Sequence, residues 1–368
     1  MKPKEGPGFF TKILLFINFL LVVALLLSYL APVTNPVKTW IIPFLGLGYP
    51  PLLLANLIFI VFWAISRRWY ALLSVVAILV GLKPLQNTIG FNEARTYKQK
   101  ISPQAIRVMT YNVHNFKRFG ARNDVSTKHE ILDIISQYQP DILGIQEFYT
   151  KFRGEYAMRD SIKYFLHANM YFEAVNYNTP YDAAGMAIFT KYKIINQGLI
   201  WLSDPGNGNQ CLFTDLVNKR DTFRFYSIHL KSIGFDQEDY QSMDNVPKGK
   251  TDMHSYRRIA GKLKQAFIKR SKQVAIIKAH AAKCPYPYII SGDFNDTPSS
   301  YAVHTIGTGM KNAFFEKGSG LGKTYNGDFP NYQIDYIFTT KQFSVRNYQV
   351  IERKLSDHYP VYSDLLLK

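Results

Sequence analysis

The chain has 368 residues, a net charge of +17 and an aromatic content of 15%. This length allows one large domain or two ordinary ones. The basic balance suits a polyanionic partner such as nucleic acid or anionic lipid, although a generally solvated basic surface explains it equally well. The two cysteines, Cys211 and Cys284, stand far apart in apolar surroundings. They exclude a disulfide framework and a cysteine-based zinc site.

Residues 1–90 predict an all-α membrane leader of about three transmembrane helices, over 13–30, 41–65 and 69–86. Pro50 and Pro51 should kink or break the second of these helices. The basic residues Lys2 and Lys4 and the pair Arg67-Arg68 favour the cytoplasmic side. We therefore expect a multi-pass membrane protein in which everything after about residue 90 is extracytoplasmic, whereas two spans would place that part in the cytoplasm.

A polar linker is expected over 91–104, followed by a single domain over 105–368 in which strand-like runs alternate with helical patterns. One helix should begin at the capping box of Thr127 and Glu130. Several apolar runs end on polar side chains, namely Asn112, Glu147, His229 and Asp293. Such strand ends meet at one rim of an α/β layer and predict a site there, although a turn after a strand also favours Asp and Asn.

Two further motifs follow near the carboxyl end. Asp335 interrupts an apolar run, and Asp357 and His358 form a pair before the closing strand. The segment 234–252, which comes after His229, is polar and irregular and is a candidate for substrate selection. Each of these signals is weak alone, because a single histidine or carboxylate at a strand end is more often structural than catalytic.

Taken in order, the motifs resemble the endonuclease/exonuclease/phosphatase superfamily over roughly residues 105–368. The resemblance implies an α/β (α+β) fold, a four-layer sandwich of two mixed β-sheets flanked by helices, here preceded by the all-α transmembrane segment. It also implies hydrolysis of a phosphoester with a divalent metal, usually Mg²⁺, with Mn²⁺ possible. The motifs that carry it are Tyr111-Asn112-Val113, Ile145-Gln146-Glu147, Ser227-Ile228-His229-Leu230, Gly292-Asp293-Phe294-Asn295, Ile334-Asp335-Tyr336-Ile337 and Ser356-Asp357-His358.

The resemblance implies a metal site in which Glu147 is the principal ligand, assisted by Asn112 and Asp357. Oxygen ligands of this kind suit a hard cation. His114 stands where several nucleases of the family carry a second metal-binding Asp, which favours one metal ion over two.

The resemblance also implies the catalytic roles. Asp293 would position or deprotonate the attacking water, and Asn295 would donate a hydrogen bond to the phosphoryl oxygens. His358 would be held by Asp335 in its protonated form. His229 matches the second histidine of the deoxyribonuclease and sphingomyelinase branches, and Asn112, Asn295 and His229 would contact the substrate.

The leading hypothesis is a membrane-anchored, Mg²⁺-dependent phosphoesterase that hydrolyses phosphodiester bonds of nucleic acid or phospholipid. One alternative is a lipid-headgroup phosphodiesterase, sphingomyelinase-like or active in lipid-anchor remodelling, and another is a non-catalytic membrane-bound binding module. The retained acids and histidines argue against the binding module. An apolar mouth of the site would favour lipid, whereas a continuous Lys/Arg groove would favour nucleic acid. The sequence leaves the oligomeric state open.

Overall fold

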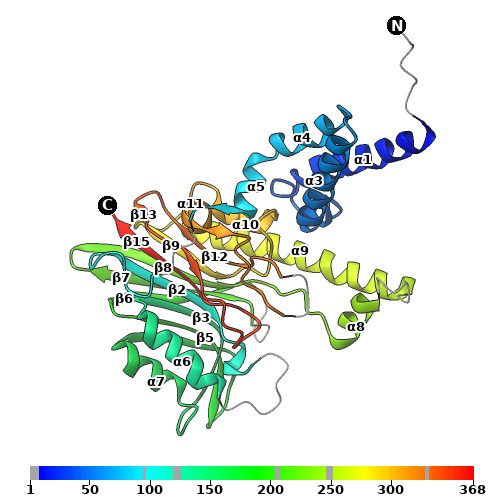
Figure 1. The fold of residues 1–368 in the computed structure, drawn as a ribbon. Coiled ribbons are helices and arrows are strands. Elements are labelled where there is room, and N and C mark those ends of the chain that lie inside the picture. The colour runs from blue at the N-terminus through cyan, green and yellow to red at the C-terminus, as the bar shows by residue number, and fades with distance from the viewer. Residues whose placement is uncertain (1–7, 94–96, 119–125, 204–207, 246–251, 328–330) are drawn as a thin grey trace.

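The computed structural model describes residues 8–93, 97–118, 126–203, 208–245, 252–327 and 331–368. Lys2, Lys4 and parts of the segments 91–104 and 234–252 lie outside the described residues. The amino-terminal part is helical, and the rest of the chain builds two large β-sheets with helices on their outer faces (Figure 1).

The amino-terminal helices are α1 (Phe9–Ser28), α2 (Ile42–Leu47), α3 (Tyr49–Ile65), α4 (Ala71–Val80) and α5 (Leu82–Thr88). Among the described residues, α1 alone is a single straight helix long and apolar enough to cross a membrane; α4 and α5 pass the same test only together, across a bend of 72°. The expected helix over 41–65 is interrupted at Gly48, and Pro50 and Pro51 lie in the first turn of α3, where proline is tolerated. Length and composition therefore identify one candidate span.

Helices α1, α3 and α4 pack around a polar centre. Asn18 donates from Nδ2 to Ser74 Oγ (2.7 Å), and Ser74 Oγ donates to Asn56 Oδ1 (2.8 Å). Trp63 Nε1 completes the network by donating to Asn18 Oδ1 (2.9 Å). These side chains are buried, whereas the large side chains on the outside of the bundle are apolar, among them Phe16, Leu20, Leu54, Ile58, Val61, Leu72 and Val76. The buried network lies beside the apolar core residues Val22, Leu25 and Leu53, and the large apolar side chains on the outside are unlike the polar surface of a water-soluble bundle.

The first sheet has the order β13-β15-β2-β3-β5-β4, with β14 paired to β15, and the second has the order β10-β12-β9-β8-β7-β6. The strands of the first are β2 (Ile106–Asn112), β3 (Ile142–Lys151), β4 (Asn169–Asn178), β5 (Asp182–Thr190), β13 (Phe343–Val345), β14 (Gln349–Val350) and β15 (Val361–Leu367). Those of the second are β6 (Lys193–Trp201), β7 (Gln210–Asn218), β8 (Asp221–His229), β9 (Tyr288–Asp293), β10 (Lys311–Asn312) and β12 (Asp335–Thr339). The short strands β1 (Gly90–Phe91) and β11 (Ser319–Gly320) pair separately.

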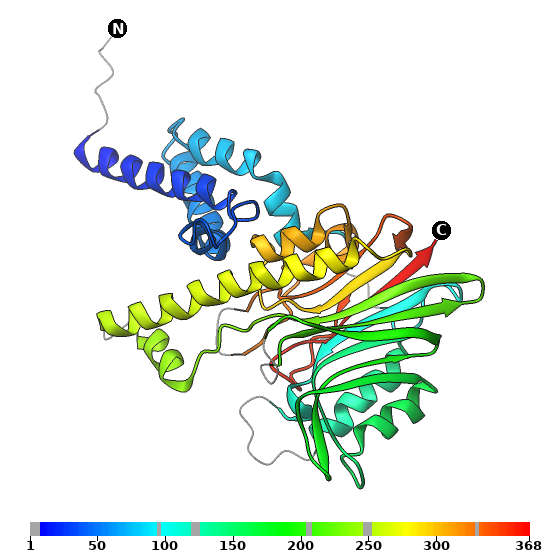
Figure 2. The ribbon, with the colours of Figure 1, turned by 180° about the vertical axis from the view of Figure 1, so that it is seen from behind.

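The two sheets pack face to face over an apolar core that includes Ile188, Phe225 and Ile289. Helices α6 (Thr127–Tyr138) and α7 (Met158–Leu166) cover the first sheet, and α9 (Met253–Ala281) and α10 (Tyr301–Gly307) cover the second (Figures 1 and 2). The remaining helices are α8 (Gln237–Asn245), α11 (Ala313–Lys317) and a 3-10 turn over His114–Phe116. The expected four-layer sandwich of two mixed sheets is confirmed.

The sheets approach closely near the strand ends that carry the candidate site residues. Gly144 on β3 faces β8, and a Cβ at this position would lie 2.8 Å from Ser227 Oγ. Gln146 Nε2 donates to the same Ser227 Oγ at 3.0 Å. This buried hydrogen bond joins the two sheets beside the strand ends, so it fixes their separation where the candidate site lies.

Parts of the expected linker over 91–104 contact the sandwich that follows. Phe91 pairs with Ser319 between β1 and β11. Arg107, which is fully buried, donates to the carbonyl oxygens of Lys98 (2.6 Å) and Gln99 (2.8 Å). Carbonyl groups of the expected polar linker thus satisfy a buried guanidinium.

The amino-terminal helices also contact the sandwich through α2. The ring of Phe44 lies edge-on to that of Phe267 on α9, with 5.3 Å between the centroids. Gly46 lies so close to Ser299 that a Cβ would be 2.8 Å from its carbonyl oxygen. Figures 1 and 2 show the bundle seated beside α9 and α10.

Candidate active site

The candidate residues converge because of how the strands pair. β8 and β9 are parallel neighbours, and their last residues, His229 and Asp293, are directly opposite one another. β12 runs antiparallel on the other side of β9, and its first residue, Asp335, is opposite Asp293. Asp293 is therefore flanked on both sides along the same rim of the second sheet. The first sheet supplies Asn112 from the end of β2.

Glu147 reaches the site through a β-bulge in β3. The pairing of β3 with β5 shifts between Ile145 and Phe148, and Glu147 itself has φ +50°. A left-handed conformation costs a non-glycine residue roughly 1–3 kcal/mol and persists where the surroundings impose it. The bulge re-aims the side chain, and Asn112 Nδ2 donates to Glu147 Oε1 at 3.1 Å.

Asp293 is buried and held by three hydrogen bonds. Its Oδ1 accepts from the backbone N–H of Asn295 (2.8 Å), and its Oδ2 accepts from the side-chain amides of Asn295 (3.0 Å) and Asn112 (3.1 Å). The amide of Asn295 also donates to the Leu230 carbonyl (3.1 Å). Burial raises the pKa of Asp293. Asn295 thus orients the carboxylate.

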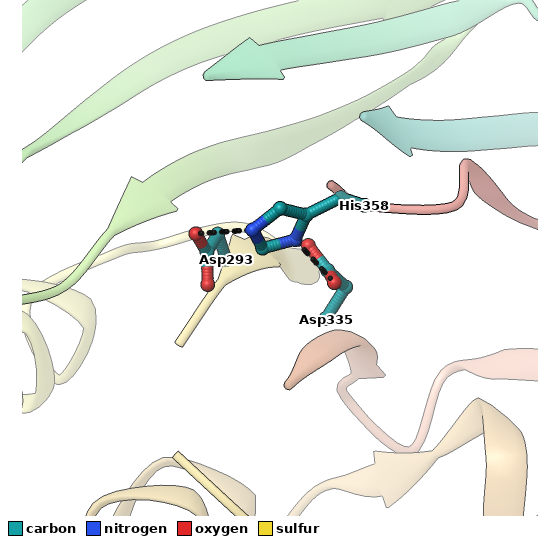
Figure 3. Close-up of side chains that lie close together, drawn as sticks. All are labelled: Asp293, Asp335 and His358. Carbon is teal, nitrogen blue, oxygen red and sulfur yellow. Dashed lines mark hydrogen bonds and ion pairs between the residues drawn. The ribbon is translucent and has the colours of Figure 1, made fainter. Parts of the chain in front are cut away.

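His358 and Asp335 form a buried pair beside Asp293 (Figure 3). Nδ1 of His358 lies 3.0 Å from Asp335 Oδ2, and its Nε2 lies 3.7 Å from Asp293 Oδ2. Burial works against the charged imidazole, but the carboxylates of Asp335 and Asp293 outweigh it and raise the pKa of His358 well above its ordinary value. Thr324 Oγ1 accepts from the Asp335 backbone N–H (3.0 Å), which positions the carboxylate.

A second group of oxygen atoms faces His114. Nδ1 of His114 lies 3.5 Å from Glu147 Oε2 and 3.7 Å from Asp357 Oδ1, so both carboxylates point toward the His114 imidazole. Burial would raise the pKa of Glu147, but hydrogen bonding to His114, the charge of His229 and the Asn112 amide lower it to about 2. His229 Nε2 lies between the two groups, 3.6 Å from Asp293 Oδ2 and 3.9 Å from Glu147 Oε1.

Two sets of atoms near the rim could hold a cation. Ligand atoms of Asp293, Asp335 and His358 lie within 4.8 Å of one another. A ligating histidine must be neutral, however, and these two carboxylates favour the protonated imidazole. The ionised Glu147 and Asp357 offer only oxygen atoms, as a hard divalent cation prefers. The Asn112 amide turns Nδ2 toward Glu147, and its Oδ1 accepts from the His114 backbone N–H at 3.2 Å. The second set therefore fits a cation better.

The structure brings all the sequence-predicted site residues together at one end of the sandwich, namely Asn112, Glu147, His229, Asp293, Asn295, Asp335, Asp357 and His358. The sequence showed that His114 occupies an unusual place in the motif, but it did not predict the contacts of His114 with Glu147 and Asp357. It also gave no sign of the apolar wall that Leu47, Leu263 and Phe267 add to the pocket in front of these residues. That wall joins segments more than 200 residues apart, so no local pattern could have indicated it.

Residues 109–358 match the family model described as Endonuclease/Exonuclease/phosphatase family. The chain belongs to this family. Residues 11–88 match a second model, described as a domain of unknown function (DUF8431). A comparison with the curated proteins finds no match. The family assignment confirms the resemblance drawn from the motifs and makes this end of the sandwich the family's candidate phosphoesterase centre.

Solved structures of the family share the fold. The catalytic domain of human Nocturnin superposes with a TM-score of 0.52 at 19% identity, over 73% of this chain and 96% of that one. An endonuclease/exonuclease/phosphatase family protein from Leptotrichia buccalis gives 0.51 at 17% identity, over 71% of this chain and 99% of that one. A protein from Beutenbergia cavernae with the same description gives 0.51 at 18% identity, over 72% of each chain. These likenesses establish the fold.

Proposed function

We propose that this protein is a membrane-anchored phosphodiesterase that uses a divalent cation, Mg²⁺ in the first place and Mn²⁺ as a substitute. One observation carries the proposal. The protonated His358, paired with Asp335, and the ionised Glu147 lie at the same end of the β-sandwich. A protein that only bound a partner would gain nothing from burying Asp293, Asp335 and His358, because burying charged groups costs free energy. This cost disfavours the non-catalytic alternative.

The geometry supports a separate role in the proposed reaction for each group of residues. A divalent cation held by Glu147, Asp357 and Asn112 would offset the negative charge on the phosphoryl oxygens. Asp293, fixed by its three donors, accepts a proton from the attacking water or orients it. His358 donates a hydrogen bond from Nε2 to a phosphoryl oxygen while Asp335 holds the proton on Nδ1.

His229 and Asn295 complete the proposed site. His229 lies beside both Asp293 and Glu147, a place from which it can contact the substrate or the leaving oxygen. Because the Asn295 amide already donates to Asp293 and Leu230, we assign it chiefly to the orientation of Asp293. Donation to the phosphoryl group would require this amide to exchange a partner.

The exposed apolar side chains of α1, α3 and α4 support anchoring in the membrane by several helices and not by α1 alone. Lys12 on α1 and Trp69, just before α4, border one hollow, so both lie at the end of the bundle remote from α2. The pair Arg67-Arg68 belongs to this remote end, and α5 leads the chain back to the sandwich (Figure 1). With the positive end in the cytoplasm, we propose a multi-pass leader and an extracytoplasmic catalytic domain.

The pocket in front of the site favours a lipid phosphodiester over nucleic acid. Besides the site residues, its lining includes the apolar side chains of Leu47, Leu263 and Phe267. Apart from His358, Arg270 is the only basic side chain among the described lining residues, and its Nε donates to Asp296 Oδ2 at 2.8 Å. A nucleic-acid groove needs several Lys or Arg side chains to face the phosphates. A lipid-headgroup phosphodiesterase, sphingomyelinase-like or active on lipid anchors, is therefore our preferred form of the function.

The full-length protein in nanodiscs tests this function. We expect hydrolysis of bis(4-nitrophenyl) phosphate that stops with a chelator and returns with Mg²⁺. A parallel panel of phospholipid, sphingomyelin, DNA and RNA identifies the class of substrate. His358→Ala should lose at least about 10²-fold in kcat/KM. Unchanged activity in that variant would contradict the proposal.

A further inference from the structure

The pocket in front of the candidate site has a polar end and an apolar end. It encloses about 230 Å³. Asp293, Asp357 and His358 line the polar end, and the apolar side chains come from α2, from α9 and from the segment after β8, namely Leu47, Leu263, Phe267, Ile233 and Phe235. One continuous hollow therefore joins the centre where phosphate would react to a wall that the amino-terminal helices help to build.

Several independent contacts fix Leu47 at this wall. Its carbonyl oxygen accepts from Tyr332 Oη at 3.4 Å. One turn earlier, Phe44 contacts Phe267 edge-to-face, and Gly46 lies against Ser299 with no room for a Cβ. Because the contacts come from three separate segments of the sandwich, the wall is a packed feature of the fold.

An ion pair lies beside the wall, and Nη2 of its guanidinium, on Arg270, is buried without a hydrogen-bond partner among the described residues. Arg270 is buried, and it donates to Asp296 (2.8 Å) and to the Lys231 carbonyl (3.0 Å). Burial of the Asp296 carboxyl raises its pKa, and the Arg270 charge opposes this rise. The apolar side chains of the wall, and not the charge of Arg270, are therefore the part of the pocket that suits an alkyl group.

The volume limits what such a group can be. A water molecule occupies about 30 Å³ of liquid, so the hollow has room for roughly eight waters. A phosphoryl group and a few methylenes fit, whereas a complete acyl chain does not. The remainder of a longer chain would have to leave the hollow past α2, where the apolar surface of the bundle begins.

We infer that Leu47 is a specificity-determining residue that contacts the first methylenes of an alkyl or acyl chain, in a phosphodiester whose phosphate lies at His358. The inference rests on the proposed function and narrows its substrate to amphipathic phosphodiesters. Each methylene moved from water onto an apolar wall is worth roughly fourfold in binding. Two or three such methylenes give a preference of about tenfold or more.

The test compares 4-nitrophenyl octyl phosphate with 4-nitrophenyl methyl phosphate, on the full-length protein in nanodiscs of one composition. The parent should favour the octyl ester by about tenfold or more in kcat/KM. Leu47→Gln should lower the octyl-to-methyl ratio by about tenfold. Leu45→Gln is the matched control, because Leu45 lies on the same helix, is also half-buried and does not line the pocket. It should leave the ratio unchanged.

A second variant covers the case in which Leu47→Gln fails to fold, as judged by its thermal unfolding against Leu45→Gln. Leu47→Trp fills the wall with an apolar ring, and it should move the preference from octyl to shorter chains. A parent without chain-length preference, or folded Leu47 variants that keep the octyl preference, would overturn the inference. No hydrolysis of either ester with any divalent cation would instead refute the proposed function. Hydrolysis of the methyl ester alone would leave that function standing.

Discussion

At the scale of single residues, the site depends on a proton that Asp335 holds on His358. The two side chains are buried and 3.0 Å apart, and the pKa of His358 lies well above its ordinary value. The imidazole is therefore charged at neutral pH and loses its charge only as the pH rises through that elevated pKa. Activity that needs the charged form should be lost on the alkaline side.

Asp335→Asn should move this alkaline limb to lower pH. The amide keeps the shape of the carboxylate but removes the charge that most strongly favours the imidazolium. We expect kcat/KM at neutral pH to fall by about 10²-fold or more. The measurement is the dependence of kcat/KM on pH for both proteins. An alkaline limb at the same pH in the variant would show that Asp335 does not set the titration.

Glu147→Gln should weaken binding of the cation. A neutral amide replaces a carboxylate whose pKa is about 2, so the charge that attracts a divalent ion is lost. We expect at least about a tenfold increase in the Mg²⁺ concentration that gives half-maximal activity. Titration calorimetry with Mg²⁺ checks the affinity directly. Glu155→Gln is the control, because this exposed carboxylate lies outside the site, and equal weakening in both variants would contradict the assignment.

At the scale of elements, β2, the strand that ends at Asn112, is anchored by a buried ion pair. Arg107 on β2 donates from Nε to Asp364 Oδ1 (2.7 Å) and from Nη2 to Asp364 Oδ2 (2.9 Å), and both side chains are fully buried. The pair joins β2 to β15 across the sheet. It also holds the carbonyl groups of residues 97–99 against the domain.

Arg107→Met should lower the free energy of unfolding by about 3–5 kcal/mol, because Asp364 would remain as a buried charge without its partner. Denaturant unfolding followed by fluorescence measures the change. The control is Arg118→Met, which removes a 3.2 Å pair with Glu130 in which both side chains are partly exposed. An exposed pair contributes less than about 1 kcal/mol, so similar losses in the two variants would contradict the prediction.

Asn18→Leu should destabilise the amino-terminal bundle by about 1–2 kcal/mol. The substitution leaves Trp63 Nε1 without the acceptor that it has in the network and removes the donor to Ser74. Thermal unfolding in detergent checks the loss. Leu20→Ala, on an exposed part of the same helix, should change the midpoint much less, and the opposite order would refute the buried network.

The sequence predicted the elements whose signals are local. The helix after β2 begins at Thr127 as predicted, although Thr127 is its first residue and Ser126 holds the cap position. The second apolar segment is broken where prolines indicated, at Gly48 just before them. The left-handed bulge at Glu147 and the packing of Phe44 on Phe267 had no such signal. Both features depend on partners that are distant in the sequence, so no local pattern could indicate them.

At the scale of the whole molecule, the direction of the chain through the bundle predicts its topology. Fusions of alkaline phosphatase and of green fluorescent protein to Lys368 report on opposite sides of a bacterial inner membrane. We expect an active phosphatase fusion and a dark fluorescent fusion, because the Arg67-Arg68 end of the bundle should face the cytoplasm. The reverse pattern would place the catalytic domain in the cytoplasm and refute the proposed arrangement of spans.

The division of the site between two sheets has a consequence for how activity appears. Asn112 and Glu147 belong to one sheet, whereas His229, Asp293 and Asp335 belong to the other. If the proposed function holds, neither half suffices alone, so a chain that has formed its strands but not yet docked its two sheets should be inactive. During refolding, enzymatic activity should therefore return later than the far-ultraviolet circular dichroism signal of the strands. The return of activity would report the docking of the two sheets, which the hydrogen bond between Gln146 and Ser227 joins.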